Sequence, residues 1–428
     1  MYLNSVELTN IRGFRSLKWD LGKAPKKGWH VIIGDNASGK TSFLRSVALS
    51  LLGVTDISAL RQNLNEWVTQ GEDSGSTKLN FYYEGKWDRF VHRGQPLKNW
   101  YLQAGLDFIR GDDEPRIEQQ IFHHSPRRHV WGHGAGWFSA GYGPFRRFQQ
   151  QAFTRRRTSE SHERIGRHAS LFGEDYTFSE ALQWLTTLQF KKLEERPEGQ
   201  LLDPLIAFIN QDDFLPHGVQ LQEVTSEGVV FVDANGAVLP VEELSHGFHS
   251  LLSMTFELIR QLALTYGPTR VFDPKRPHVI APPGVVLIDE IDAHLHPTWQ
   301  RRVGLWFRQH FPNIQFLVTT HSPLVCQAAD VGSIFRLPQP GTDDGGEMLA
   351  DDALNRLLYG NVLDAYSTGA FGEDVGRSAA GLVMLQRLAE LNSKDRRSTL
   401  TEAEIREQQQ LRALAPTAAA TTQADVAL

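Results

Sequence analysis

The segment "HVIIGDNASGKTSFL" at residues 30–44 constrains the fold of this chain more than any other stretch. An apolar run typical of a buried strand ends at Gly34, and apolar residues with helical spacing follow Lys40. A glycine-rich turn between a strand and a helix brings several backbone N–H groups and the positive end of a helix to one place. The segment therefore predicts a phosphate-binding loop in an α/β fold.

The predicted loop has the spacing G-x-x-x-x-G-K-T from Gly34 to Thr41. Its glycines let the backbone approach a ligand closely, Lys40 adds positive charge for the β- and γ-phosphates, and the Thr41 hydroxyl can hold Mg²⁺. The residues that we expect to contact ATP are Gly34, Asn36, Ala37, Ser38, Gly39, Lys40, Thr41 and Ser42. The alternative is a glycine-rich strand–helix turn that binds no ligand.

The segment "GVVLIDEIDAHLHP" at residues 284–297 predicts the second part of a phosphate site. An apolar strand ends there in Asp289 and Glu290, and ligands of doubly wound sheets bind at the carboxyl ends of the strands. We expect Asp289 to hold Mg²⁺ through water and Glu290 to polarise the attacking water. The alternative is an acidic strand end that caps the next helix.

Two further motifs complete the pattern. The strand "QFLVTTHSP" leads to His321, where a histidine can sense the γ-phosphate through a hydrogen bond, although a structural turn residue is the alternative. In "VEELSHGFHS", Ser245 is a natural helix N-cap. The same Ser-x-Gly at a helix N-terminus, from Ser245 to Gly247, also predicts a second anion site whose phosphate comes from a partner subunit.

Length, charge and cysteine content limit the class of protein. The chain has 428 residues, a formal net charge of −6 and one cysteine. The length suits one large domain or two to three smaller ones, and the charge argues against a general polyanion binder. Cys326 excludes an internal disulfide framework and fits a reducing cytosol. With no secretory signal and no run of about 20 apolar residues, we expect a cytoplasmic protein without a membrane partner.

The pattern of elements predicts four parts. Residues 1–106 carry the phosphate-binding loop, and residues 107–215 form an arginine-rich and helical insertion. Residues 216–370 carry the Ser-x-Gly, Asp-Glu and histidine motifs, and residues 371–428 form a helical tail with a disordered end. Within the first part, residues 76–94 predict a β-hairpin with its turn at Glu84-Gly85, and residues 107–170 are expected to be irregular.

The four motifs, in this order, resemble those of ABC-type ATPase heads, and "VELTNIRGFRSLKWDLG" resembles the opening of the SMC, RecF and OLD-like branch. The resemblance implies an α/β fold, namely an ABC-type (RecF/SMC-like) P-loop ATPase head with a mixed central sheet, a helical or irregular insertion and a helical tail. It implies that Arg12 contacts the nucleotide phosphates and that ATP binds between two heads. Leu244, Ser245 and Gly247 would then act in trans as the signature, and Asp292 would match the D-loop. No Q-loop glutamine can be assigned, although residues 149–151 lie near the right place.

Within this branch, "GYGPFRR", "HASLFGEDYTFSEALQWL" and "DEIDAHLHPTWQRRV" resemble PtuA-like ATPases of Septu and retron-associated anti-phage systems. The resemblance implies a homo-oligomer of at least two heads and an HNH-type nuclease partner. A retron-associated version would add a reverse transcriptase and its RNA–DNA hybrid. We therefore expect an ATPase that dimerises around ATP and regulates a nuclease. The alternative is a RecF-like ATPase that acts on DNA directly, and intrinsic nuclease activity is not expected.

An arginine-rich stretch with interleaved aromatic residues extends from residue 127 to 168. Arginines that alternate with aromatic residues suit phosphate contacts and base stacking. The residues expected to contact nucleic acid or a protein partner are Arg146, Arg147, Arg155, Arg156 and Arg157. The alternative is a solvated insertion. A metal pair at His294 and His296 is not expected, because no third ligand is apparent.

Overall fold

The computed structural model describes residues 1–60, 63–91, 102–111, 115–132, 135–144, 163–173, 179–211, 214–215, 218–226, 228–240, 246–342, 344–366, 368, 371, 378–397 and 399–414. One compact unit comprises residues 1–371, and another comprises residues 372–428. We describe each unit by itself.

A mixed sheet with the strand order β16-β15-β3-β14-β13-β7 forms the centre of the larger unit. Its strands are β3 (Gly28–Ile33), β7 (Ser139–Tyr142), β13 (Gly284–Ile288), β14 (Ile314–Thr319), β15 (Gly332–Arg336) and β16 (Glu347–Met348). β16 runs antiparallel to β15, and the remaining neighbouring pairs are parallel. Because parallel strands end at the same edge of a sheet, the loops after β3, β13 and β14 meet at that edge.

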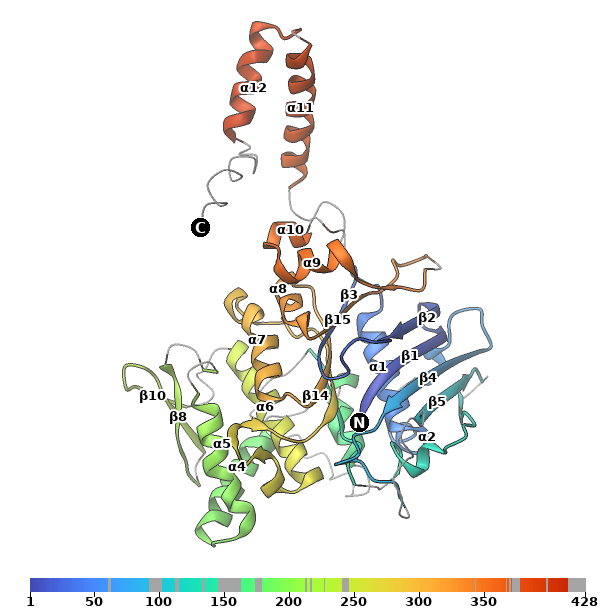
Figure 1. Cartoon of the computed structure of the whole chain (residues 1–428), viewed down its shortest axis with the longest axis vertical. Helices are drawn as coiled ribbons and strands as arrows, with labels where there is room; N and C mark the ends of the chain where they lie inside the picture. Colours follow the sequence, from blue (N-terminus) through green and yellow to red (C-terminus); the bar gives the residue numbers. More distant parts are fainter. Residues whose placement is uncertain are drawn as a thin grey trace. The chain divides into compact units, whose positions relative to one another are not determined.

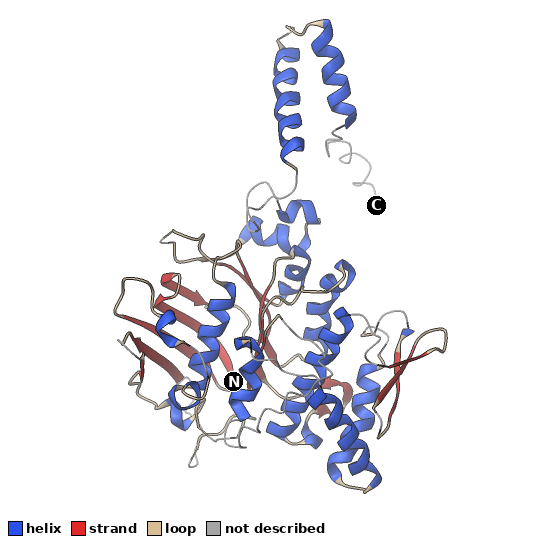
Figure 2. Cartoon of the chain, turned by 180° about the vertical axis from the view of Figure 1, so that it is seen from behind, coloured by secondary structure: helices blue, strands red, loops and turns tan. Residues whose placement is uncertain are grey.

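Both faces of this sheet are buried, which explains why its strands are apolar at nearly every position. Ile32 and Leu287 point into one hydrophobic cluster, whereas Val31 and Val286 point into the other. On the first face lie α1 (Lys40–Leu52) and an antiparallel sheet, and on the second lie α6 (His246–Tyr266) and α7 (Pro297–His310) (Figure 1). Figure 2 shows these layers from behind.

The antiparallel sheet has the strand order β2-β1-β4-β5-β6. Its strands are β1 (Tyr2–Ile11), β2 (Phe14–Asp20), β4 (Ser74–Tyr82), β5 (Leu102–Ile109) and β6 (Arg116–Gln119). The predicted hairpin turning at Glu84-Gly85 is wrong, because β4 pairs with β1 and β5 and residues 83–91 form no strand. The prediction that residues 107–170 are irregular is also wrong in part, because the end of β5 and all of β6 and β7 lie there.

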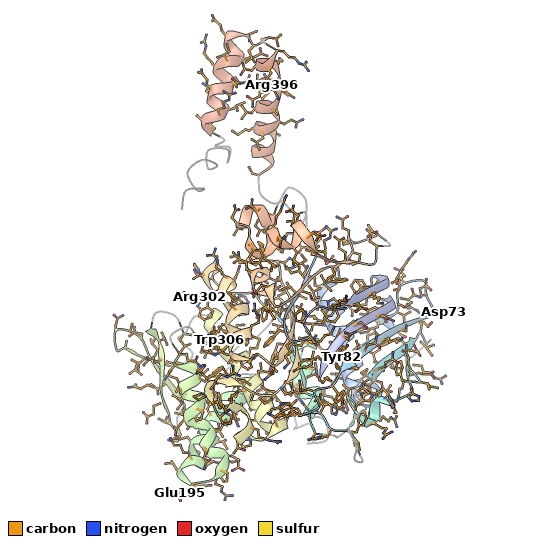
Figure 3. All side chains as sticks on the ribbon, viewed as in Figure 1. Asp73, Tyr82, Glu195, Arg302, Trp306 and Arg396 are labelled. Atoms are coloured by element: carbon orange, nitrogen blue, oxygen red, sulfur yellow. The ribbon has the colours of Figure 1, made fainter. Side chains whose placement is uncertain are left out.

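Helices and a small sheet cover the second face. A three-stranded sheet within the described residues has the order β10-β9-β8, and its neighbours include α4 and α5. These elements are α4 (Ser179–Leu193), α5 (Leu202–Ile209), β8 (Gln220–Val224), β9 (Val229–Val232) and β10 (Val238–Pro240). On α7, the ring of Trp306 stacks on Phe214 with 4.3 Å between ring centroids, whereas Arg302 is exposed (Figure 3). α7 therefore buries an aromatic stripe and keeps its charged face in solvent.

Shorter elements connect these layers. They are α2 (Val54–Ile57), α3 (Glu163–His168), α8 (Pro323–Cys326), α9 (Asp351–Tyr359), α10 (Val362–Tyr366), β11 (Phe272–Asp273) and β12 (Arg276–Ile280). The structure thus confirms the predicted α/β fold with a mixed central sheet. In the part of the chain that is described, no helix combines the length and apolar character needed to cross a bilayer.

The smaller unit is a helical hairpin of α11 (Ala379–Arg396) and α12 (Glu402–Leu414). α12 begins with a capping box, in which the Glu404 N–H donates to Thr401 Oγ1 at 3.3 Å and the Thr401 N–H donates to Glu404 Oε2 at 2.9 Å. Arg387 on α11 forms an ion pair with Glu407 on α12 at 2.9 Å. Leu388 and Leu391 are buried in the hairpin.

Candidate functional site

The loop between β3 and α1 folds around the ammonium group of Lys40. Lys40 Nζ donates to the carbonyl oxygens of Gly34 at 2.8 Å and Asp35 at 2.9 Å. Within the described residues, the buried Ser38 Oγ has no hydrogen-bond partner. An unsatisfied buried hydroxyl and a lysine bonded to its own loop are groups that a phosphate could engage, so these residues fit the predicted ligand.

Close packing against the Phe14 side chain explains why Gly39 stands before α1. Its φ angle of 92° is in the left-handed region, and a Cβ there would lie 2.6 Å from Cζ of Phe14 at the start of β2. The turn between β1 and β2 therefore lies directly against the phosphate-binding loop. This contact was not part of the sequence prediction, since nothing near Phe14 indicates its distant partner.

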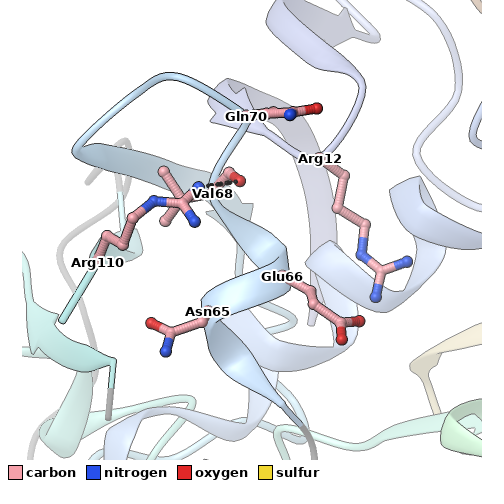
Figure 4. A pocket seen from close by; sticks show the side chains of 6 residues that line it. All are labelled: Arg12, Asn65, Glu66, Val68, Gln70 and Arg110. Atoms are coloured by element: carbon pink, nitrogen blue, oxygen red, sulfur yellow. Dashed lines mark hydrogen bonds between the residues drawn. The ribbon is translucent and has the colours of Figure 1, made fainter. Parts of the chain in front are cut away.

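The β1–β2 turn also carries Arg12. Its backbone N–H donates to the Trp67 carbonyl at 2.8 Å, and its guanidinium carbon lies 4.6 Å from the centroid of the Trp67 ring. A cavity of about 440 Å³ opens beside it (Figure 4). The cavity is lined by Arg12, Asn65, Glu66, Val68, Gln70 and Arg110. Arg12 therefore lies at the wall of a cavity, two residues from the contact with the phosphate-binding loop.

Asp289 joins three elements at the carboxyl edge of the sheet. The Thr41 hydroxyl donates to Asp289 Oδ2 at 2.7 Å, and the Thr319 hydroxyl donates to Asp289 Oδ1 at 2.6 Å. Asp289 follows β13, Thr319 ends β14 and Thr41 lies in the first turn of α1. Because β14 lies between β3 and β13, these residues meet although they are far apart in the sequence.

Glu290 is half-buried and has a φ angle of 47°. A left-handed conformation costs a residue other than glycine about 1–2 kcal/mol, and such strain concentrates at functional sites. The Glu290 N–H donates to the Thr319 hydroxyl oxygen at 2.8 Å, which helps to hold this backbone conformation. Glu290, whose backbone is strained, therefore lies next to Asp289 at the end of β13.

Asp292 links the segment after β13 to His321. Its Oδ1 accepts hydrogen bonds from the Thr320 hydroxyl at 2.5 Å and from the His321 N–H at 3.3 Å. The next residue, Ser322, donates through its hydroxyl to Oε1 of Gln300 on α7 at 2.7 Å. The His321 side chain is exposed, so the backbone of the loop is held while the imidazole faces solvent.

The described part of the predicted signature is Gly247, in the first turn of α6. A Cβ there would lie 2.6 Å from the His294 carbonyl oxygen, so the start of α6 packs against the segment that follows Asp292. The other signature residues, Leu244 and Ser245, lie outside the described residues. The same holds for the candidate contacts Arg146, Arg147, Arg155, Arg156 and Arg157, and for the glutamines at 149–151.

Burial and neighbouring carboxylates act in opposite directions on Lys40. Burial lowers the pKa of Lys40, and the negative charges of Asp289 and Glu290 oppose this effect. Among the described residues, no group of three or more His, Cys, Asp or Glu side chains is arranged to hold a metal ion. Mg²⁺ at this edge would therefore take few protein ligands, Thr41 and Asp289, with phosphate and water oxygens supplying the rest. His296 instead caps α7, where its Nδ1 accepts from the Thr298 N–H at 3.3 Å.

Sequence reasoning missed Thr319, Thr320 and Gln300. The two adjacent threonines directly before His321 were a usable signal, because they end an apolar strand next to the predicted acidic one. It also missed β7, which pairs with β13 in parallel. The short sequence "SAGY" of β7 has little strand propensity, so no local signal could reveal it.

Comparisons with known proteins agree with this geometry. A family model described as "AAA domain, putative AbiEii toxin, Type IV TA system" matches residues 148–327. Septu protein PtuA of Bacillus mycoides (strain KBAB4) is 26% identical over 76% of this chain and 38% of its own length. The Retron Ec83 probable ATPase of Escherichia coli is 38% identical over 29% of this chain and 22% of its own length. The chain thus spans well under half of the length of these two relatives.

A solved SMC head bound to the C-winged helix domain of ScpA is 14% identical, with 82% of this chain and 98% of that chain covered and a TM-score of 0.49. The central sheet, the phosphate-binding loop and the acidic strand end are those of an ABC-type ATPase. Within that class, the chain is close to the PtuA-like proteins of Septu systems and to retron ATPases.

Proposed function

We propose that this protein binds and hydrolyses ATP with Mg²⁺ between two copies of its head, and thereby regulates an associated nuclease in anti-phage defence. The observation that carries the catalytic part is the hydrogen-bonded chain from Thr41 to Asp289 to Thr319. It brings the phosphate-binding loop and the acidic strand end together at the edge where α/β sheets bind ligands. A glycine-rich turn without a ligand would not need the buried carboxylate of Asp289 beside it.

The loop residues bind the triphosphate in this proposal. Lys40 exchanges its bonds to the loop carbonyls for bonds to phosphate oxygens, and the Ser38 hydroxyl and the loop amides add donors. Arg12 adds a cation from the β1–β2 turn, and the cavity beside it is open to another part of the nucleotide. Mg²⁺, held by Thr41 and Asp289 when bound, supplies charge neutralisation at the phosphates.

Glu290 and His321 act on the reaction itself. The Glu290 carboxylate accepts a proton from the attacking water, whose oxygen bonds to the γ-phosphorus as the bond to the β–γ bridging oxygen breaks. ADP and phosphate are the products. The exposed imidazole of His321 donates a hydrogen bond to the γ-phosphate.

The intersubunit part rests on the signature and the D-loop. Gly247 packs against the His294 carbonyl, which supports placing the start of α6 beside the Asp292 segment of its own head. Leu244, Ser245 and Gly247 would contact ATP bound to the other head, as the resemblance to SMC- and RecF-like heads implies. ATP would then hold two heads together, and hydrolysis would release them.

The defence role rests on the relatives. Proteins named Septu protein PtuA and Retron Ec83 probable ATPase match 76% and 29% of this chain, which supports a role in systems of the same kind. An HNH-type nuclease is the partner that we propose. In a retron-associated version, a reverse transcriptase and its RNA–DNA hybrid would join the assembly.

Two substitutions test the catalytic proposal. We expect Lys40→Ala to abolish ATP binding, and Glu290→Gln to retain binding but lose turnover by roughly 10²-fold or more, because only the second acts on the water. ATP affinity and turnover are measured separately. Lys23→Ala, at an exposed lysine of the same unit, is the matched control and should change neither. Normal turnover in Glu290→Gln would remove this residue from the catalytic role.

A further inference from the structure

Thr319, the last residue of β14, forms hydrogen bonds with both acidic residues that follow β13, Asp289 and Glu290. The two strands are parallel with Ile288 beside Val318, so Asp289 and Thr319 are the next pair in register. The Thr319 side chain is fully buried. Its hydroxyl donates to Asp289 Oδ1 at 2.6 Å and accepts from the Glu290 N–H at 2.8 Å. One oxygen atom therefore contacts two consecutive acidic residues.

In these two bonds the hydroxyl is a donor once and an acceptor once. Its single hydrogen points to the Asp289 carboxylate, and a lone pair receives the backbone of Glu290. The Thr41 hydroxyl holds the second carboxylate oxygen of Asp289 at 2.7 Å. Asp289 is thus bonded through each of its oxygens, once from the phosphate-binding loop and once from β14.

Thr320 makes a separate contact. Its hydroxyl donates to Asp292 Oδ1, and its own oxygen accepts from the Ser322 N–H at 3.0 Å. Thr319 therefore contacts Asp289 and Glu290, whereas Thr320 contacts Asp292 and the loop that carries His321. The division means that a change at Thr319 can be tested without removing the Asp292 contact.

We propose that Thr319 is a positioning residue for ATP hydrolysis, whose hydroxyl fixes the Asp289 carboxylate and the Glu290 backbone relative to each other. This inference rests on the proposed ATPase function. Without the hydroxyl, Asp289 loses one of its two hydroxyl donors and the left-handed backbone of Glu290 loses a bond that holds it. Both acids then sample orientations that are not productive.

Thr319→Val tests the proposal because valine keeps the shape and removes the hydroxyl, and Thr319→Ser keeps the hydroxyl. We expect Thr319→Val to lower kcat by roughly 10- to 100-fold while KM for ATP changes by less than about 3-fold, as is typical for residues that orient ligands of a metal site. Thr319→Ser should stay within about 3-fold of the wild-type kcat. If Thr319→Val does not fold, Thr319→Ala is used in its place with the same expectation.

A second readout does not depend on turnover. With a non-hydrolysable ATP analogue and saturating Mg²⁺, Thr319→Val should bind within about 3-fold of the wild type, which confines the loss to turnover. Thr255→Val is the matched control. Thr255 is fully buried in α6, and its hydroxyl has no hydrogen-bond partner in the described structure, so the control should change neither readout.

The outcomes separate this inference from the function on which it rests. Absent turnover in the wild type, or normal turnover in Glu290→Gln, overturns the proposed function. If the wild type hydrolyses ATP and Glu290→Gln does not, a wild-type kcat in Thr319→Val overturns the role of Thr319 alone. An equal loss in Thr319→Ser and Thr319→Val also overturns it, because keeping the hydroxyl would then give no advantage over removing it.

Discussion

The hydroxyl of Thr41 donates to Asp289 Oδ2 at 2.7 Å across 248 positions of the sequence. This contact joins the first turn of α1 to the end of β13, with β14 between them in the sheet. It links two of the loops at the edge of the sheet where the loops after β3, β13 and β14 meet. A substitution in any of these three loops should therefore act on the same site.

The left-handed conformation and the close packing of Gly39 can be separated experimentally. Gly39 and Gly71 have φ angles of 92° and 89°, but a Cβ at Gly71 has no atom within 4 Å. Gly71→Ala should cost about 1–2 kcal/mol of unfolding free energy from backbone strain alone. Gly39→Ala should cost more and also weaken ATP binding, because its Cβ displaces Phe14 and the loop. Denaturant unfolding and ATP titration measure both, and an equal loss in the two variants would contradict the packing role.

The trans signature predicts complementation between mutant heads. Ser245→Arg should block ATPase activity without weakening ATP binding to a single head, because the added bulk and charge enter only the intersubunit site. Mixing Ser245→Arg with Lys40→Ala should restore at most one composite site per dimer. Activity of the single and mixed proteins is compared at equal total concentration. Normal hydrolysis by a verified Ser245→Arg monomer would exclude the trans arrangement.

Buried histidines predict a loss of stability in acid. Burial lowers the pKa of His30 to about 4, of His129 to about 4 and of His168 to about 3. Below pH 6.5 the unfolded chain binds protons that the folded chain does not, so the unfolding free energy falls as the pH falls from 6.5 to 4. The slope is about 1.4 kcal/mol per pH unit for each histidine.

His168→Gln should make this slope shallower by about one histidine's share, whatever it does to stability at pH 8. Urea unfolding at several pH values between 4 and 8 gives the slope for each protein. At pH 8 all three imidazoles are neutral in both states, so the pH-independent cost of the substitution is read there. An unchanged slope would show that His168 is not one of the groups that resist protonation in the folded state.

The helical tail predicts a separation between nucleotide binding and assembly. Residues 372–428 form their own compact unit, and the phosphate-binding loop, Asp289 and His321 lie in the other. Truncation after Gly372 should leave ATP binding intact and weaken self-association or capture of the nuclease. Size-exclusion chromatography and a pull-down with the proposed nuclease partner give the two results. An unchanged oligomer together with unchanged capture would assign no assembly role to the tail.

Substitutions in the arginine-rich segment should distinguish an ATPase that regulates a nuclease from a RecF-like ATPase that acts on DNA. If Arg155, Arg156 and Arg157 contact phosphates, their joint replacement by alanine should shallow the log–log salt slope of duplex binding by roughly 2–3 units. ATP turnover without nucleic acid should stay unchanged. This result favours a RecF-like ATPase that acts on DNA, whereas retained DNA binding with loss of the nuclease favours a protein-docking role. Wild-type behaviour in both assays and in phage protection would leave a solvated segment.

The sequence was sufficient to predict the α/β fold and the strand ends at Gly34, Asp289 and His321, because glycine spacing and apolar runs are local signals. It was not sufficient to predict the pairing of β4 with β5, since a turn signal at Glu84-Gly85 gives no information about which strand follows. Nor could it predict that Phe14 packs under Gly39 or that Thr319 bonds both acids. Those contacts depend on strand order, which no local pattern encodes.

The position of β14 between β3 and β13 has a consequence for synthesis on the ribosome. β3 pairs with β14 and β15, so its partners are translated after residue 313. A nascent chain that already carries the phosphate-binding loop therefore leaves both edges of an apolar strand unpaired for most of its elongation. Such high contact order makes folding slow and exposes the strand to aggregation or to chaperones. It also means that an unfinished chain has no Asp289 beside Thr41, so the proposed nucleotide hydrolysis would begin only once nearly all of the head has been made.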